Sequence, residues 1–276
     1  MLPWVKTNSG LRMSQPRMGK VMHGDAPTLF LHGGPGGCAA FERAHFGRSL
    51  PIHWWDQPRS VVLYPSPFGA LVGAAEAELR LLAQRGGGPV DVVAHGFGAT
   101  LALGLAARMP SALGRVVLLA PVADVGAAFV RFAMSLDAGG NDAGFVTAAL
   151  AAFRERPDFA RFGLLVDAVV QARSAAAMVP AQRRHRTRAP CRGMFDRGVF
   201  DAVVGDAWLR PLPLLPEHGV ALAASAHVVL GAADPMLDVD IESRRWAALC
   251  PAARFSVVPG GHFVHLDAPL SAWWPP

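Results

Sequence analysis

Cysteine, lysine and tyrosine are scarce in these 276 residues. The three cysteines, Cys38, Cys191 and Cys250, lie far apart and lack the spacing of a disulfide framework or a zinc site. We therefore expect free thiols in a reducing compartment. Because Lys6 and Lys20 are the only lysines, the net charge of +5 comes almost entirely from arginine.

Long uninterrupted apolar runs are also absent, although 52% of the residues are hydrophobic and the mean hydropathy is +0.29. Charges, prolines or glycine turns break every apolar stretch before it reaches the roughly 20 residues that cross a bilayer. The first residues lack the basic start and apolar run of a secretory signal. These absences predict a cytoplasmic protein without membrane contact.

The densest positive charge lies between Arg183 and Arg188, with Arg192 close behind. Such a run is most often a solvated surface, and neither interleaved aromatics nor a nucleic-acid motif accompanies it. Nucleic acid is therefore not an expected partner. The run leaves open a small-molecule substrate that is anionic or bound to an acidic carrier protein. No pattern fixes the oligomeric state.

Short apolar runs alternate with helical patterns along most of the chain. This alternation predicts an α/β fold, a doubly wound and mostly parallel sheet covered on both faces. The expected strands span 28–31, 52–55, 90–93, 115–120, 227–230 and 254–258, and the expected helices between them span 71–84, 99–108 and 242–249.

The alternation stops between about Asp124 and Ala224, where helical patterns rich in alanine, arginine and phenylalanine follow one another, as in 147–156 and 162–177. This segment is too long for a plain connection. We expect a core of residues 1–123 and 225–276, interrupted by a helical cap of residues 124–224. Aromatic side chains that either roof a pocket or fill the cap's own core are Phe145, Phe153, Phe159, Phe162, Phe195 and Trp208.

Gly96 lies at a turn where a predicted strand runs into a predicted helix. The segment 92–100 reads Val-Val-Ala-His-Gly-Phe-Gly-Ala-Thr, the setting of the G-x-S-x-G elbow that presents a nucleophilic serine. Gly96 occupies the position of that serine. Glycine has the smallest steric penalty in such a strained turn, so it preserves the turn while removing the hydroxyl.

Three further segments lie at strand ends. The segment 32–37, His-Gly-Gly-Pro-Gly-Gly, follows the first strand, and glycines there let backbone N–H groups approach a ligand closely, as an oxyanion hole requires. Asp234 follows a later strand, and His262 follows the last one. The order elbow, acid, histidine is that of α/β-hydrolases.

On these motifs the chain resembles the α/β-hydrolase superfamily, and the HGGPG loop followed by Trp-Trp-Asp-Gln at 54–57 is similar to the proline iminopeptidase family. The resemblance implies that Asp234 is the triad acid and His262 the general base. It also implies that the backbone N–H groups of Gly34 and Phe97 form the oxyanion hole. The chain departs from the family at Gly96 and after Gln57, and the acidic cap residues that hold a substrate amine have no matching motif.

Other assignments stay open at this point. Asp124, just beyond another strand end, is an alternative acid, and Cys38, just past the glycine loop, is a candidate displaced nucleophile. His95 is expected to be a packing residue of the elbow. His262 and His265 lack a further ligand cluster in the sequence, so no metal is expected, and no cofactor motif is present.

Three functions remain compatible with these residues. In the favoured one, His262 and Asp234 act on a small carbonyl-containing metabolite by general acid/base catalysis without a covalent acyl-enzyme, as a lyase, decarboxylase, isomerase, cyclase or water-mediated hydrolase. In the second, the protein is an ordinary serine hydrolase inactivated at Gly96. In the third, it is a ligand-binding protein without activity.

Overall fold

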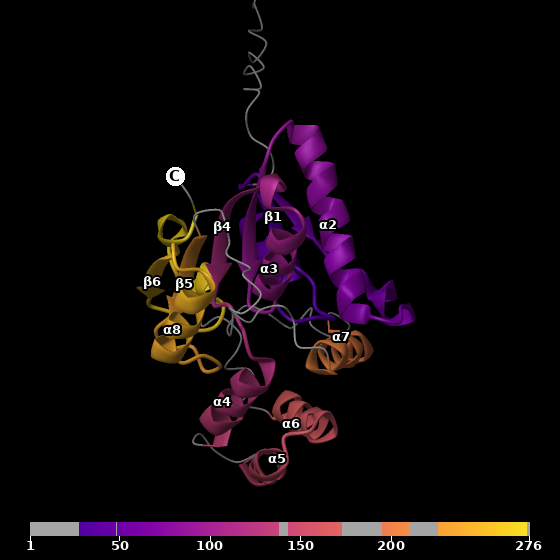
Figure 1. The fold of residues 1–276 in the computed structure, drawn as a ribbon. Helices are drawn as coiled ribbons and strands as arrows, with labels where there is room; N and C mark the ends of the chain where they lie inside the picture. Colours follow the sequence, from indigo (N-terminus) through magenta and orange to yellow (C-terminus); the bar gives the residue numbers. More distant parts are fainter. Residues whose placement is uncertain (1–27, 48, 138–142, 173–194, 210–225, 275–276) are drawn as a thin grey trace, which may run out of the picture.

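The computed structural model describes residues 28–47, 49–137, 143–172, 195–209 and 226–274 (Figure 1). The run from Arg183 to Arg188, together with Arg192, Cys191, Lys6 and Lys20, lies outside these residues. No helix within them is long and apolar enough to cross a lipid bilayer.

Six parallel strands form one sheet in the order β2-β1-β3-β4-β5-β6. The strands are β1 (Thr28–Leu31), β2 (Ile52–Trp55), β3 (Val90–His95), β4 (Leu113–Leu119), β5 (Ala226–Gly231) and β6 (Arg254–Val258). Parallel strands buried on both faces are mostly apolar, and β1, β3, β4 and β5 are largely buried and mostly apolar. The predicted α/β class with a parallel sheet is confirmed.

The core helices are α1 (Ala40–Phe46), α2 (Pro67–Gly86), α3 (Gly98–Arg108), α8 (Val239–Leu249) and α9 (Val264–Asp267), with short 3-10 turns at Arg59–Leu63, Pro110–Ala112 and Leu270–Ala272. Helix α2 begins four residues before the predicted start. Ser66 caps it by accepting a hydrogen bond from the N–H of Gly69, and Pro67 occupies the first turn.

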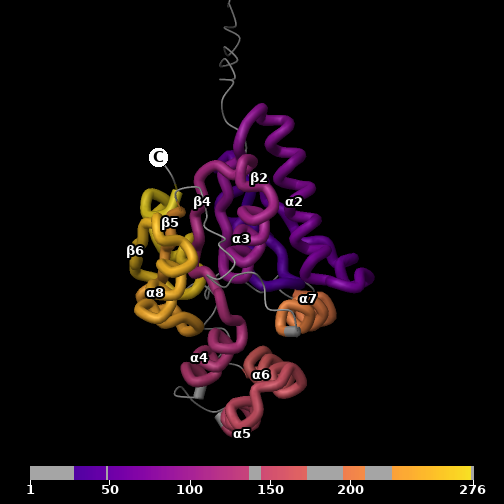
Figure 2. The backbone as a smooth tube through the Cα atoms, in the orientation of Figure 1, coloured from indigo at the N-terminus to yellow at the C-terminus, as the bar shows by residue number. Residues whose placement is uncertain are grey.

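In the described part of the stretch between β4 and β5 there are four helices: α4 (Val125–Asp137), α5 (Ala143–Glu155), α6 (Phe159–Gln171) and α7 (Arg197–Leu209). Figures 1 and 2 show them gathered at the end of the sheet where β4 leads into α4, beyond the carboxyl ends of the strands. Helix α6 ends at Gln171, so the helix expected over 162–177 is shorter than predicted.

Aromatic rings fill the centre of this helical insertion. The ring of Phe162 stacks on Trp208 with centroids 5.2 Å apart, and Phe153 and Phe159 lie against the same pair. A polar contact joins the insertion to the core, because Oδ2 of Asp206 accepts a hydrogen bond of 2.7 Å from the Ser66 hydroxyl. This contact ties α7 to the start of α2.

Candidate active site

The turn between β3 and α3 places Gly96 in the left-handed region, with φ of +53°. Its N–H donates to the carbonyl of Leu119 and its carbonyl accepts from the N–H of Val122, so the neighbouring strand end holds the turn. A Cβ at position 96 would lie 3.3 Å from Nε2 of His262. A side chain at this position would thus point at the imidazole.

Asp234 and His262 meet at the carboxyl ends of β5 and β6. Oδ2 of Asp234 lies 2.9 Å from Nδ1 of His262, and both side chains are buried. Oδ1 of the same carboxylate accepts hydrogen bonds from the N–H groups of Met236 and Leu237. The contact leaves Nε2 as the ring nitrogen on the Gly96 side.

Burial alone would raise the pKa of Asp234, because it penalises the charged form. The attraction of His262, its hydrogen bond and the two backbone N–H donors outweigh burial and hold the pKa of this carboxyl below its usual value. Asp234 is therefore an ionised acceptor at neutral pH, and it favours the imidazole tautomer that carries its proton on Nδ1.

The glycine loop after β1 is tied to the end of β2 through His32. The N–H of Gln57 donates to Nε2 of His32, so Nδ1 carries the proton and donates to the carbonyl of Gly33, 2.9 Å away. Burial lowers the pKa of His32, which keeps this ring neutral. No role for His32 was predicted, and its two hydrogen bonds show that it holds the loop in place.

Gly34 and Phe97 lie on the same cavity as His262. Gly34 has φ of +64°, and within the described residues no backbone carbonyl accepts a hydrogen bond from the N–H of either Gly34 or Phe97. Both residues therefore line the cavity of His262 with N–H groups that bond to no backbone carbonyl among the described residues.

A cavity of about 450 Å³ opens between the sheet edge and the helical insertion. Its polar lining includes His32, Glu42, His95 and His262, and most of the other lining residues are apolar. No arginine or lysine belongs to the lining among the described residues. The apolar wall is contributed by Phe129, Phe132, Val166, Val169, Phe195 and Phe200.

Of the six aromatic residues named as candidates for the pocket roof, only Phe195 lines this cavity. Phe153, Phe159, Phe162 and Trp208 belong to the core of the insertion, and Phe145 is exposed. Helical spacing alone does not separate a face turned to a cavity from a face turned to a core. The phenylalanines of α4 and α7 that form the wall were missed for this reason.

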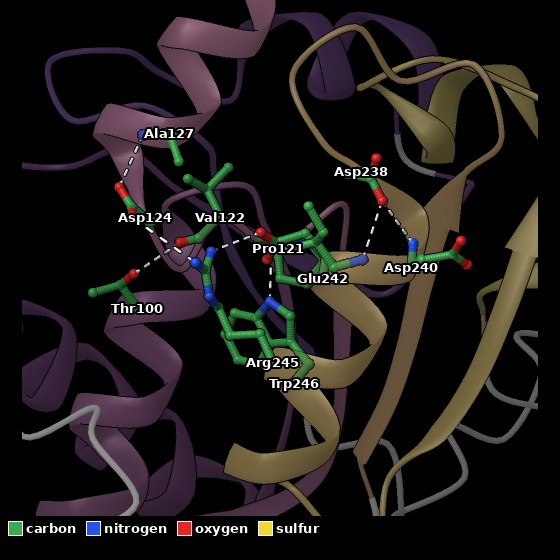
Figure 3. A network of polar contacts seen from close by, with 11 residues as sticks. Thr100, Pro121, Val122, Asp124, Ala127, Asp238, Asp240, Glu242, Arg245 and Trp246 are labelled. Atoms are coloured by element: carbon green, nitrogen blue, oxygen red, sulfur yellow. Dashed lines mark hydrogen bonds and ion pairs between the residues drawn. The ribbon is translucent and has the colours of Figure 1, made fainter. Parts of the chain in front are cut away.

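Asp124 lies away from His262, in the polar network of Figure 3. Its Oδ1 accepts a hydrogen bond from the N–H of Ala127 at the start of α4, and its Oδ2 lies 3.9 Å from the guanidinium of Arg245. The carboxylate beside the imidazole is that of Asp234. Asp124 is therefore a helix cap with a weak ion pair, and the alternative acid assignment has no geometric support.

A second buried polar cluster lies behind His262. Nε2 of His95 donates to the carbonyl of His262, and Nε2 of His265 lies 3.1 Å from Oε1 of Glu42. Burial, together with repulsion by neighbouring imidazoles, keeps the pKa of His95 well below its usual value and lowers the pKa of His265 to about 3. No sequence signal joins Glu42 to a histidine 223 positions away.

Cys38 lines the same cavity and is a free thiol of intermediate exposure. The described residues give it no hydrogen-bonded base, so the geometry does not favour it as a displaced nucleophile.

Many solved structures are similar to this chain, and the following three share its fold. A proline iminopeptidase-related protein from Thermus thermophilus is 24% identical with a TM-score of 0.54, over 89% of this chain and 86% of that one. A proline iminopeptidase from Mycobacterium smegmatis is 18% identical with a TM-score of 0.52, over 92% and 86%. An N-acyl homoserine lactone degrading enzyme is 21% identical with a TM-score of 0.51, over 89% of each chain.

The comparison with curated proteins gave no match. The family model of the alpha/beta hydrolases, in contrast, matches residues 21–273, which include the glycine loop, the turn at Gly96, Asp234 and His262. This chain therefore belongs to the alpha/beta hydrolase family.

Proposed function

We propose that this protein is an enzyme that acts on a small, largely apolar carbonyl compound by general acid/base catalysis, without a covalent acyl-enzyme. One observation carries the proposal. Asp234 holds Nδ1 of His262, and Nε2 of the same ring is the nitrogen beside the empty side-chain position of Gly96 at the cavity. In this proposal Asp234 is the acid that orients the ring and His262 is the general base.

Because Gly96 has no hydroxyl group, His262 acts directly on water or on the substrate in the first step. Nε2 of His262 takes a proton from a water molecule or from an acidic C–H or O–H group of the substrate. When water is the donor, its oxygen adds to the carbonyl carbon; when the substrate is the donor, the electron pair of the broken C–H or O–H bond forms an enolate or alkoxide. In either case negative charge develops on the substrate oxygen, where the N–H groups of Gly34 and Phe97 donate to it. The proton passes from Nε2 to the leaving group or to a second carbon of the substrate, which restores the neutral imidazole.

Magnitudes limit the chemistry. Loss of a nucleophilic serine costs roughly a millionfold in serine proteases, so peptide hydrolysis is excluded from the proposal. A positioned base contributes about 10² to 10⁴, and an oxyanion donor about 10² to 10³. These factors suit an activated ester, an elimination, a decarboxylation, an isomerisation or a cyclisation.

Helices α4 to α7, within the segment 124–224, serve in this proposal as the cap that supplies the apolar wall. The described lining disfavours an anionic substrate, because it contains the carboxyl group of Glu42 and no arginine or lysine. A carrier-bound or anionic substrate would depend on the run from Arg183 to Arg188, which lies outside the described residues.

The test compares native protein with His262→Ala in metabolite extracts of the source cell, followed by mass spectrometry. His53→Ala is the matched control, because His53 lies on the edge strand β2, is partly exposed and pairs with Glu78. A compound consumed by the native and control proteins but not by His262→Ala supports the proposal. Equal consumption by all three proteins overturns it.

A second candidate, a serine hydrolase inactivated at Gly96, is favoured by the distance of 3.3 Å between a Cβ at this position and Nε2 of His262. A serine there would lie within reach of the base. Gly96→Ser treated with a fluorophosphonate probe tests this candidate, with Gly96→Ala as control. Labelling of the serine variant alone supports it, and absence of labelling in a folded variant argues against it.

A ligand that binds tightly to the native protein and is recovered unchanged would indicate the third function, a ligand-binding protein without activity.

A further inference from the structure

We propose that Glu42, His95 and His265 form a binding site for a divalent transition-metal ion, with zinc as the best-matched ion, on the floor of the cavity. The inference does not depend on the proposed function. It concerns binding, and it requires no catalytic role for the ion.

The three side chains converge from three elements. Glu42 lies on α1, His95 ends β3 and His265 lies on α9, and all three are buried. One ligand atom from each lies within 4.8 Å of the other two. Among the described residues this is the group of carboxylate and imidazole donors that comes close enough to share one ion.

The spacing suits a small tetrahedral ion. Zinc bonds of about 2.0–2.1 Å to nitrogen and oxygen place neighbouring tetrahedral ligands about 3.3 Å apart. Oε1 of Glu42 and Nε2 of His265 are already 3.1 Å apart. The widest pair in the group needs to close by at most about 1.5 Å, which is within the reach of side-chain torsions.

One buried ring atom points to an incomplete site. Nδ1 of His95 has no hydrogen-bond partner within the described residues. A buried polar atom left without a partner is costly, and an ion or water that engages the cluster would reduce that cost. The ring nitrogen opposite a metal bond usually donates to another group, and Nε2 of His95 already donates to the carbonyl of His262.

Access for an ion and a fourth ligand comes from the cavity. Glu42 and His95 line it, whereas His265 lies deeper. Two imidazoles and one carboxylate form the protein ligand set of several catalytic zinc sites, in which water fills the fourth position. A water molecule entering from the cavity would complete the coordination here.

The competing interpretation is a plain hydrogen bond, in which His265 donates to Glu42 and ties α9 to α1. The two interpretations differ in metal content. Full-length protein is stripped with a chelator, incubated with zinc sulfate, separated from free zinc by gel filtration and analysed by mass spectrometry for metal. We expect about one zinc per chain, and a rise in thermal midpoint with zinc concentration, because an ion that binds only the folded state stabilises it.

Variants locate the ion. His265→Gln and Glu42→Gln should retain less than about a fifth of the native zinc. His53→Gln is the matched control, because its Nε2 lies 2.9 Å from a carboxylate oxygen of Glu78 in a surface pair without a third ligand among the described residues. This control and His262→Ala should retain about one zinc per chain.

Two results would overturn the proposal. One is native protein that retains no zinc and shows no zinc-dependent change in thermal midpoint, a result that needs no variant to fold. The other is equal zinc retention by native protein and His265→Gln, which would place the ion elsewhere in the chain.

Discussion

The conformation of Gly96 leads to a stability prediction for Gly96→Ala. With φ of +53°, an alanine costs about 1–2 kcal/mol for a left-handed conformation, and its Cβ lies 3.3 Å from Nε2 of His262. The methyl group also restricts the unfolded chain, which offsets about 0.4–1 kcal/mol. We expect a net loss near 1 kcal/mol, or about 2–4 °C in thermal midpoint, measured by calorimetry or circular dichroism.

Two other glycines calibrate this measurement. Gly73 lies in the middle of α2 with nothing within 4 Å of the position that a Cβ would take, so Gly73→Ala should be neutral or stabilising by up to about 1 kcal/mol. At Gly98 a Cβ would come within 2.3 Å of the carbonyl oxygen of Leu31, so Gly98→Ala should cost more than Gly96→Ala. The reasoning fails if Gly96→Ala is as stable as Gly73→Ala.

Three further substitutions test other parts of the structure. Because the pKa of Asp234 is depressed in the folded state, its carboxylate stabilises the fold above about pH 4 and loses that effect as the pH falls through the folded pKa. The difference in unfolding free energy between native protein and Asp234→Asn should therefore shrink below about pH 4. A difference that grows there would contradict the assignment. Phe132→Ala should cost about 3–5 kcal/mol in urea unfolding because Phe132 is buried, whereas the exposed Phe145→Ala should change little. Arg43→Ala should cost less than about 1 kcal/mol, with the effect reduced further by salt, because its pair with Asp56 is half-exposed.

Most of the sheet follows from local sequence. The strands at Thr28–Leu31, Ile52–Trp55 and Arg254–Val258 have the predicted bounds, because short runs rich in β-branched and aromatic residues lie between turn residues. Strand β3 runs two residues further than predicted, to His95. The ladder with β4 continues up to the turn, since His95 pairs with Leu119.

Only those site residues that belong to a recognised sequence motif could be predicted from the sequence. The sequence motifs named Asp234 and His262, and the structure brings these two side chains together. The roles assigned to them, to Gly34 and to Phe97 stay predictions until they are measured. His32 and the pair of Glu42 with His265 carry no motif, because their contacts join segments far apart in the chain.

The pairing of β4 with β5 has a consequence for the order of folding. Val117 pairs with His227, so roughly 100 residues loop out between two neighbouring strands. Closing a loop of this length costs only about 2 kcal/mol more than closing one of ten residues, because the entropy grows with the logarithm of length. Strands β1 to β4 emerge from the ribosome first and hold the turn at Gly96. Asp234 and His262 join only after the insertion has been made, so the arrangement around the imidazole is completed only once β5 and β6 have been synthesised.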